Sequence, residues 1–579
     1  MYVKRLKLAN FKSFKGENNV FEFSPHINYF VGNNNAGKST VIEALEFMSS
    51  PHTDAESLKN TQCGDQPCYA ELTLAGNDIE AQIDKSNVTE AKAKTIKKSC
   101  ILTEQNEQCL IARRYLNNPK TVFLFCKDAE IGKSPFNNKT GIDKPFTAIF
   151  SPTVFHATDT PDDVLDFGTT KILGKLIRAK THNLTTSNEW KEFEKSYELV
   201  FSSTGKYSEI LKDLNESLSE HTREQFPSVT VSFAFDQPDA SSFIKMGKTR
   251  VDDGVETDLD QKGTGLQRAV AFAALREYAH ILSSDARDDS ESGIDNLFLC
   301  VDEPEIWMHP KAQKQLAKTL ATISETNQVW ISTHSPYILQ GAFATNQKEK
   351  DSVNLLVFSD NHDAPHRVQK STRFGKLHKG APSLAEITYE AFQIPTIEYC
   401  LELFGVIYTY MEKLNFTDKG KTFKYKSLLD LTDDILKSQS FGLPEAYKES
   451  KKRFDSRKGR EKDNSWKNPI VDEILPLCIR NMNDHPESIS KQQDAINYFQ
   501  NNNNKDNGGN PLSPEELKEI EKISNQYNDE DLRKAIEISL KAIPRCEELM
   551  QQGHWTWDSG VNDLVDNVVS TNASTHETD

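Results

Sequence analysis

A glycine-rich loop between a strand and a helix constrains this sequence more than any other feature. Residues 32–39 read GNNNAGKS and match the pattern G-x-x-x-x-G-K-S/T. An apolar strand is expected before the loop, at 26–31, and apolar residues recur at helical spacing after it, over 40–48. In this setting the N–H groups of the loop face a phosphate at the helix start. The sequence therefore predicts a nucleotide-binding α/β domain.

The pattern gives separate tasks to the residues of this loop. The glycines let successive N–H groups point at the β-phosphate, Lys38 reaches the β- and γ-phosphates, and the Ser39 hydroxyl binds magnesium. We therefore expect ATP and Mg²⁺ as cofactors. The predicted nucleotide contacts here are Gly32, Asn33, Asn34, Asn35, Ala36, Gly37, Lys38, Ser39 and Thr40.

A second segment supplies two acids at the end of a buried strand. Residues 297–301 are five consecutive apolar residues, followed by Asp302 and Glu303. Such a run indicates a strand covered on both faces, as in a parallel sheet flanked by helices. Phosphoryl transfer to water needs charge neutralisation by a metal and an oriented nucleophile. We expect Asp302 to bind magnesium with Ser39, and Glu303 to polarise the attacking water.

The organisation of the chain predicts an α/β protein, with a P-loop ATPase head over 1–390 and a mainly helical C-terminal assembly domain over 391–569. Helical spacing over about 160–222 predicts a helical insertion in the head, too short for a long coiled-coil arm. Further strands are expected at 229–235, 329–332 and 355–358. Residues 570–579 are expected to be disordered, because they contain no apolar side chain large enough to build a core.

Composition restricts the partners of the protein. The formal net charge of -17 repels a phosphate backbone at long range, so any nucleic-acid contact must be local. No run of eighteen apolar residues occurs, and the N-terminal residues are unlike a signal peptide, so we expect a cytoplasmic protein with no membrane contact. Two basic stretches, at 92–98 and 448–462, could bind nucleic acid, although a solvated loop or helix face is the favoured interpretation of both.

Further motifs resemble a known family of ATPases. Pro304 and Glu305, the His309–Pro310 pair and the WISTHSP run at 330–336 resemble the E-P-E-x-x-x-H-P and T-H-S-P motifs of ABC ATPase heads in SMC, Rad50 and OLD-type proteins. The resemblance implies that His334 contacts the γ-phosphate. A purely structural histidine beyond a strand is the alternative.

The KGTGLQR run at 262–268 is similar to the degenerate signature sequence of OLD-like heads. In that family the signature binds the nucleotide of the opposite protomer. The resemblance therefore implies that Thr264, Gly265 and Gln267 bind nucleotide, and that the heads form a homodimer or a higher oligomer. A glycine-rich helix start without a ligand is the alternative.

The C-terminal third points to a narrower group. No Toprim motif of the form Glu-Gly-x-Ser/Thr-Glu follows His334. Instead, FQIPTIEY at 392–399 and IRNMNDHPES at 479–488 resemble segments of the PtuA ATPases of Septu and retron-linked antiphage systems. The resemblance implies a subunit that controls a PtuB-type HNH nuclease, joined in retron versions by a reverse transcriptase and its RNA-DNA product (msDNA).

Two other functions stay open. Arg480 and His485 fit the R-x4-H pattern of HEPN ribonucleases, whose paired side chains support phosphodiester cleavage, so a self-contained nuclease is one alternative. A structural pair at a helix end explains the same two residues. A DNA repair ATPase resembling RecF or Rad50 is the other alternative. The lack of a long coiled coil argues against the Rad50 version, and the additional helical tail argues against RecF.

Overall fold

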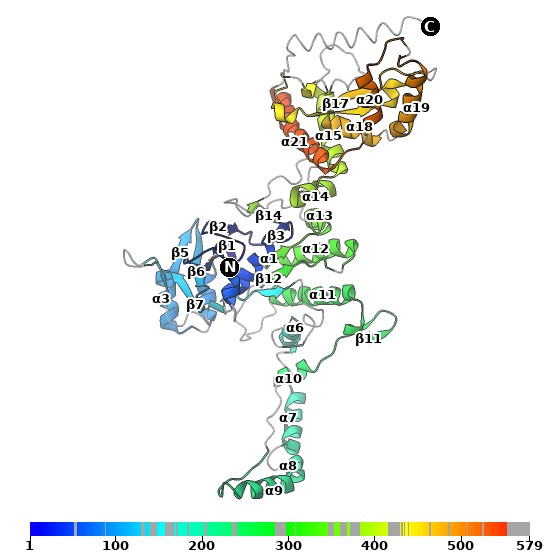
Figure 1. Cartoon of the computed structure of the whole chain (residues 1–579). Coiled ribbons are helices and arrows are strands. Elements are labelled where there is room, and N and C mark those ends of the chain that lie inside the picture. Colours follow the sequence, from blue (N-terminus) through cyan, green and yellow to red (C-terminus); the bar gives the residue numbers. More distant parts are fainter. Residues whose placement is uncertain are drawn as a thin grey trace. The chain divides into compact units, whose positions relative to one another are not determined.

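The chain divides into two compact units, Met1–Thr372 and Arg373–Asp579 (Figure 1). The predicted domain boundaries at 390 and 569 stay predictions, and the tail at 570–579 lies outside the described residues. The computed structural model describes residues 1–50, 55–86, 88–128, 134–138, 146–147, 149–156, 167–168, 172–181, 184–201, 205–233, 240–283, 297–306, 308–345, 353–358, 368–370, 382–414, 429, 432–433, 435–437, 439, 441–461, 465–484, 487–506, 508–523 and 526–552.

A six-stranded sheet forms the centre of the first unit. Its order is β15-β14-β3-β13-β12-β9; β15 pairs antiparallel at one edge and the other strands are parallel. Every residue of β3, β12 and β13 is buried, which explains their mainly apolar sequence. The strands are β3 (Ile27–Gly32), β9 (Thr153–Phe155), β12 (Phe298–Asp302), β13 (Gln328–Ser332), β14 (Val353–Phe358) and β15 (Val368–Lys370).

Helices join these parallel strands. Helix α1 (Lys38–Ser49) follows β3 and packs against β3, β12 and β13. Helix α12 (Pro310–Ser324) connects β12 to β13, and α13 (Pro336–Thr345) follows β13 and packs on α12. Helix α11 (Thr264–Ser283) precedes β12. The carboxyl ends of β3, β12 and β13 therefore meet at one edge of the sheet, where ligands of such sheets bind.

A second, antiparallel sheet shares the core of the first unit. It contains β1 (Tyr2–Ala9), β2 (Asn19–Glu22), β4 (Tyr69–Ala75), β5 (Ile101–Glu104), β6 (Glu107–Tyr115), β7 (Asn118–Phe125) and β8 (Phe136–Asn137), accompanied by helices α2 (Ile79–Lys85) and α3 (Glu90–Cys100). One hydrophobic cluster joins Leu6 and Leu72 of this sheet to Phe30, Phe298 and Trp330 of the parallel sheet. The two sheets therefore fold as one body around the nucleotide-binding loop.

Helices also form the segment between β9 and β12. They are α6 (Ile172–Thr181), α7 (Asn188–Phe201), α8 (Lys206–Ile210), α9 (Lys212–Arg223) and α10 (Ala240–Lys245), followed by the hairpin of β10 (Arg250–Asp252) and β11 (Glu256–Asp258). The strand expected at 229–235 is wrong for its described part, 229–233. There the backbone of Val231 exchanges hydrogen bonds with the Ser219 hydroxyl of α9 instead of with a strand.

The second unit is mainly helical, with one small sheet. Its helices are α14 (Leu384–Phe392), α15 (Ile397–Leu414), α17 (Ser456–Gly459), α18 (Leu475–Asp484), α19 (Glu487–Asn501), α20 (Pro514–Lys522) and α21 (Asp529–Gln552); its strands are β16 (Ser450–Phe454) and β17 (Ile470–Ile474). Helices α15, α18 and α21 pack around Leu403, Ile479 and Ile536. The predicted fold class, an α/β head followed by a mainly helical region, is confirmed.

A membrane-spanning helix was not expected. Among the described residues, no helix combines the length and apolar character that crossing a bilayer requires.

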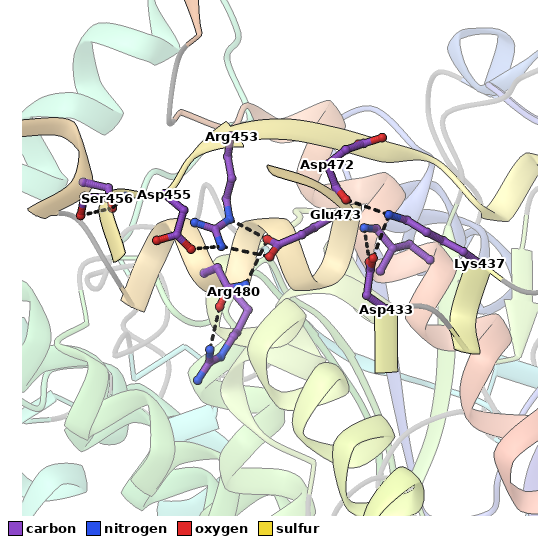
Figure 2. Close-up of polar contacts among 11 residues, drawn as sticks. Asp433, Lys437, Arg453, Asp455, Ser456, Asp472, Glu473 and Arg480 are labelled. Atoms are coloured by element: carbon purple, nitrogen blue, oxygen red, sulfur yellow. Dashed lines mark hydrogen bonds and ion pairs between the residues drawn. The ribbon is translucent and has the colours of Figure 1, made fainter. Parts of the chain in front are cut away.

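A buried ionic network centres on Arg453 of β16, which is 1% exposed (Figure 2). Its Nε is 2.6 Å from Glu473 Oε2, and one of its terminal nitrogens is 2.7 Å from Asp455 Oδ2. The Asn481 amide also donates to Glu473. The solvated-surface interpretation of the basic stretch 448–462 is therefore wrong at Arg453, because this residue is an internal counterion.

The lysines of this stretch whose side chains are described are also paired. Lys448 contacts Glu445, Lys451 contacts Asp531, and Lys452 contacts Glu519. These three ammonium groups are therefore already paired with carboxylates of the same unit, which leaves them less available to a phosphate backbone.

The network predicts the effect of removing its cation. Arg453→Ala removes the cation that pairs with two buried carboxylates and should lower the free energy of unfolding by about 3–5 kcal/mol. Denaturant unfolding of the purified chain measures this change. Lys452→Ala, which removes an exposed ion pair from the same strand, is the control and should leave the transition near that of the wild type. Similar transitions for both variants would contradict the structural role of Arg453.

Candidate functional site

The glycine-rich loop curls tightly between β3 and α1. Gly32 has φ +132°, and a Cβ there would lie 2.3 Å from the carbonyl oxygen of Phe358 in β14. Gly37 has φ +101°, and a Cβ there would lie 2.8 Å from the Phe14 ring. Both positions thus require glycine. The side chains of residues 33–35 are exposed, whereas Ala36 and Thr40 are buried in the head.

Lys38 lies within this curl. Its side chain is buried, and Nζ donates to the carbonyl oxygens of Gly32, at 3.1 Å, and Asn33, at 2.9 Å. Backbone acceptors of the loop itself therefore help to hold the ammonium group in place. A phosphate entering the loop would meet a fixed positive charge together with the N–H groups at the start of α1.

The predicted magnesium ligands are brought together at the same edge of the sheet. Ser39 Oγ is 3.1 Å from Asp302 Oδ1, although the two residues are 263 positions apart. Hydroxyl and carboxylate oxygens suit a hard cation, and Mg²⁺ in nucleotide sites takes one or two protein ligands and completes its shell with phosphates and water. Within the described ranges, no group of three or more His, Cys, Asp or Glu side chains could hold a metal ion. The pair fits a magnesium that arrives with its nucleotide.

Ser332, which the sequence analysis did not assign to the site, connects the two acids. It is the last residue of β13 and lies opposite Asp302 in the parallel register. Its hydroxyl donates a short hydrogen bond to Asp302 Oδ1 and accepts one from the backbone N–H of Glu303, at 3.1 Å. Strand register could have indicated this contact, because both residues end neighbouring strands.

Glu303 and His334 face each other beyond the strand ends. Glu303 has φ +46°, and its Oε1 is 3.3 Å from His334 Nε2. Burial, and then the Lys38 charge, lower the pKa of His334 to about 4, so the ring is neutral at neutral pH and this contact is not an ion pair. Burial and the Asp302 charge raise the pKa of Glu303. His334 Nε2 has no hydrogen-bond partner among the described residues and can serve a ligand.

The loop after β13, which carries His334, is anchored at three successive residues. The Thr333 N–H donates to the Phe30 carbonyl of β3, at 3.0 Å. The His334 N–H donates to Glu305 Oε1, and the Ser335 hydroxyl donates to Gln313 Oε1 of α12, each at 2.5 Å. Glu305 and Gln313 were not predicted as site residues, because these contacts depend on tertiary structure.

The signature residues lie at the start of α11. Thr264 begins the helix and is exposed, and Gly265 follows it. Gln267 is buried and donates to the carbonyls of Asp260, at 3.0 Å, and Lys262, at 2.8 Å. In the described residues none of the three hydrogen-bonds to the glycine-rich loop. Thr264 and Gly265 thus remain available to a ligand outside this chain, whereas Gln267 holds its own turn.

The C-terminal candidate pair is described only in part. Arg480 contacts Asp484 Oδ2, at 2.8 Å. It also donates to Asn481 Oδ1, at 2.7 Å (Figure 2). His485 lies outside the described residues, so the structure does not place it relative to Arg480. Ser488, at the end of the same segment, contacts Ser456 through its hydroxyl, at 3.1 Å. The same segment reaches the small sheet through Asn481, whose amide donates to Glu473 of β17.

Comparison with known proteins places this site in a family. Residues 1–150 and 152–339 match the family described as AAA ATPase domain. The chain is similar to the Old nuclease of Escherichia phage P2, with 26% identity over 442 residues, which are 71% of this chain and 70% of that protein. It is also similar to the DNA replication and repair protein RecF of Clostridium tetani, with 31% identity over 94 residues, 16% of this chain and 25% of that protein.

Among solved structures, the chain is similar to the Smc head bound to the C-winged helix domain of ScpA. This match covers 64% of the chain and 98% of the Smc head, with 14% identity and a TM-score of 0.36. The family match carries more weight, because it spans more than half of the chain and includes the glycine-rich loop, both acids after β12 and His334. The chain therefore belongs to the AAA ATPase domain family.

Proposed function

We propose that this chain is the ATP-hydrolysing regulatory subunit of an antiphage defence complex and controls a partner nuclease. The contact between Ser39 and Asp302 is the observation that carries the ATPase part of this proposal. It joins the glycine-rich loop to the acidic strand end, and Glu303 and His334 lie beside it. When bound, Mg²⁺ would neutralise charge on the phosphates and on the developing transition state.

Each residue of the site has a task that fits its surroundings. Lys38 supplies positive charge at the loop, and the oxygens of Ser39 and Asp302 would hold magnesium. Glu303, directed by its unusual backbone conformation, would orient the attacking water. The neutral His334 ring can donate or accept a hydrogen bond at the γ-phosphate.

The proposed catalytic unit is a head-to-tail dimer. Thr264 and Gly265 stand at a helix N-terminus, where N–H groups favour an anion. Since they make no hydrogen bond to the loop of their own chain in the described residues, their proposed ligand is the nucleotide of a second copy. Gln267 would support this contact indirectly, by fixing the turn before the helix.

The proposed partner is an HNH nuclease of the PtuB type, docked on the unit Arg373–Asp579, with a reverse transcriptase and msDNA in a retron version. The resemblance of 392–399 and 479–488 to PtuA segments supports this assignment. The net charge of -17 agrees with a chain that leaves cleavage of nucleic acid to another subunit. Within the basic stretch, Lys448, Lys451, Lys452 and Arg453 add no support, because each is already paired with a carboxylate.

An intrinsic nuclease is the second candidate function. Similarity to the Old nuclease over 71% of the chain favours it, and Arg480 with His485 would be its candidate pair. The RecF similarity, over 16% of the chain, favours a repair ATPase only through the head that all these proteins share.

The first prediction separates nucleotide binding from turnover. Lys38→Ala should weaken ATP binding at least tenfold, since hydrogen bonds to charged groups contribute about 1.5–3 kcal/mol. Glu303→Gln should keep ATP affinity near that of the wild type and lower kcat by about 10²–10⁴-fold, because it removes only the group that orients water. Binding titrations and phosphate release measure the two effects. Normal hydrolysis by Glu303→Gln would remove this residue from its proposed role.

The second prediction tests the dimer by mixing two inactive variants. Gly265→Asp and Lys38→Ala damage opposite halves of a composite site, so a mixed dimer keeps one intact site. An equal mixture should recover roughly a quarter of wild-type activity if subunits exchange at random. Lys38→Ala mixed with Glu303→Gln is the control, because these changes damage the same half and leave no intact site. Recovery in both mixtures, or in neither, would contradict the head-to-tail arrangement.

The third prediction concerns nuclease activity. The purified chain should cut neither RNA nor DNA, and cleavage should require the partner nuclease. Arg480→Ala and His485→Ala should leave the ATPase unchanged, and Asp484→Ala, which removes only the counterion of Arg480, serves as a structural control. If the wild-type chain cleaves RNA alone, and Arg480→Ala or His485→Ala stops cleavage while Asp484→Ala does not, the intrinsic nuclease is correct.

A further inference from the structure

We propose that Glu305 is a positioning residue that ties the acidic turn after β12 to the loop carrying His334. Its carboxylate accepts a hydrogen bond from the backbone N–H of His334, at 2.5 Å, across 29 residues of sequence. The inference deepens the proposed function, because it presumes ATP hydrolysis by Glu303 and His334. The inference gives a role to Glu305, because the apolar run of β12 does not explain why a glutamate stands at this position.

The turn that carries Glu305 is itself well fixed. The Glu303 N–H donates to the Ser332 carbonyl, at 3.1 Å, and the Ile306 N–H returns to the Glu303 carbonyl, at 3.3 Å. The Met308 N–H then bonds to the Glu305 carbonyl, at 2.9 Å. Glu305 therefore extends from a rigid turn that also contains the residue proposed to orient water.

Burial of the Glu305 carboxylate costs free energy, which argues that the carboxylate has a specific structural role. Burial raises the pKa of Glu305, and its Oε2 has no hydrogen-bond partner among the described residues. A buried carboxylate with an unused oxygen destabilises a fold unless the oxygen that is used makes an important contact. That contact is the one to His334, with additional stabilisation from the Thr333 hydroxyl.

The contact determines where the His334 ring lies. Thr333 is fixed to β3 and Ser335 to α12. Among the described residues, the Glu305 bond is the one that joins the backbone of His334 itself to the acidic turn. The ring contacts Glu303 at 3.3 Å. Without Glu305, the loop could rotate its peptide and withdraw the imidazole while both strands stayed in place. Glu303 and His334 are thus held as one unit.

Three substitutions at Glu305 separate the features of its side chain. Glu305→Gln keeps an oxygen at the same reach and should hold kcat within about threefold of the wild type, since an amide oxygen accepts the same bond. Glu305→Asp keeps the charge but is one methylene shorter, and Glu305→Ala removes the acceptor. Both should lower kcat at least tenfold, with KM for ATP within about threefold, because the glycine-rich loop is untouched. Glu325→Ala, an exposed glutamate at the end of α12, is the control and should behave like the wild type.

A double substitution shows whether Glu305 acts through His334. If it does, adding Glu305→Asp to His334→Ala should lower kcat no further than His334→Ala alone. Three results would overturn the proposal. They are losses of kcat that multiply in the double variant, equal losses of kcat in Glu305→Gln and Glu305→Asp, and wild-type kcat in both Glu305→Asp and Glu305→Ala. If Glu305→Ala does not fold, as judged by circular dichroism, the Gln and Asp pair still decides. These failures differ from failure of the proposed ATPase, in which the wild-type chain itself would not hydrolyse ATP.

Discussion

The meeting of Ser39 and Asp302 is the contact on which the proposed chemistry depends. Ser39 belongs to the first helix after the glycine-rich loop, whereas Asp302 ends a strand 263 residues later. Neither residue could reach the other unless β3, β13 and β12 lay in parallel with matched ends. The buried apolar strands thus do more than build a core, because their register places an oxygen pair at the edge where a phosphate would enter.

The two units use buried polar groups in different ways. In the first unit, hydroxyl groups hold Asp302 and a backbone N–H holds Glu305, whose second oxygen has no hydrogen-bond partner among the described residues. In the second unit, Arg453 lies between Glu473 and Asp455, and its charge is satisfied within the fold. An internally satisfied charge contributes to a unique arrangement of strands and helices, whereas a partly satisfied one remains available to a ligand.

The sequence predicted the strands that carry the candidate site closely, whereas the contacts between those strands lay beyond its reach. The strands at 26–31, 297–301 and 329–332 agree with β3, β12 and β13 to within one residue, because burial on both faces requires an apolar run. Ser332 and Glu305 were not assigned, since their contacts join residues about thirty positions apart and have no local pattern. The hairpin of β16 and β17 was missed for a related reason: Arg453 can be buried only because Glu473 and Asp455 accompany it, and a linear sequence does not show that pairing.

Helices α7 and α8 are weakly packed, which determines where the first unit unfolds locally. The structure buries no described residue of either helix, and α7 has 14 residues, about the length at which an isolated helix is marginal in water. Its ring contacts lie within the same inserted segment, where Trp190 packs against Phe193 and against Phe243 of α10. Amide hydrogens of this segment should therefore exchange with solvent through local opening, long before those of β3 or β12. We therefore expect that this segment can unfold or rearrange without destabilising the parallel sheet that supports the proposed ATP site.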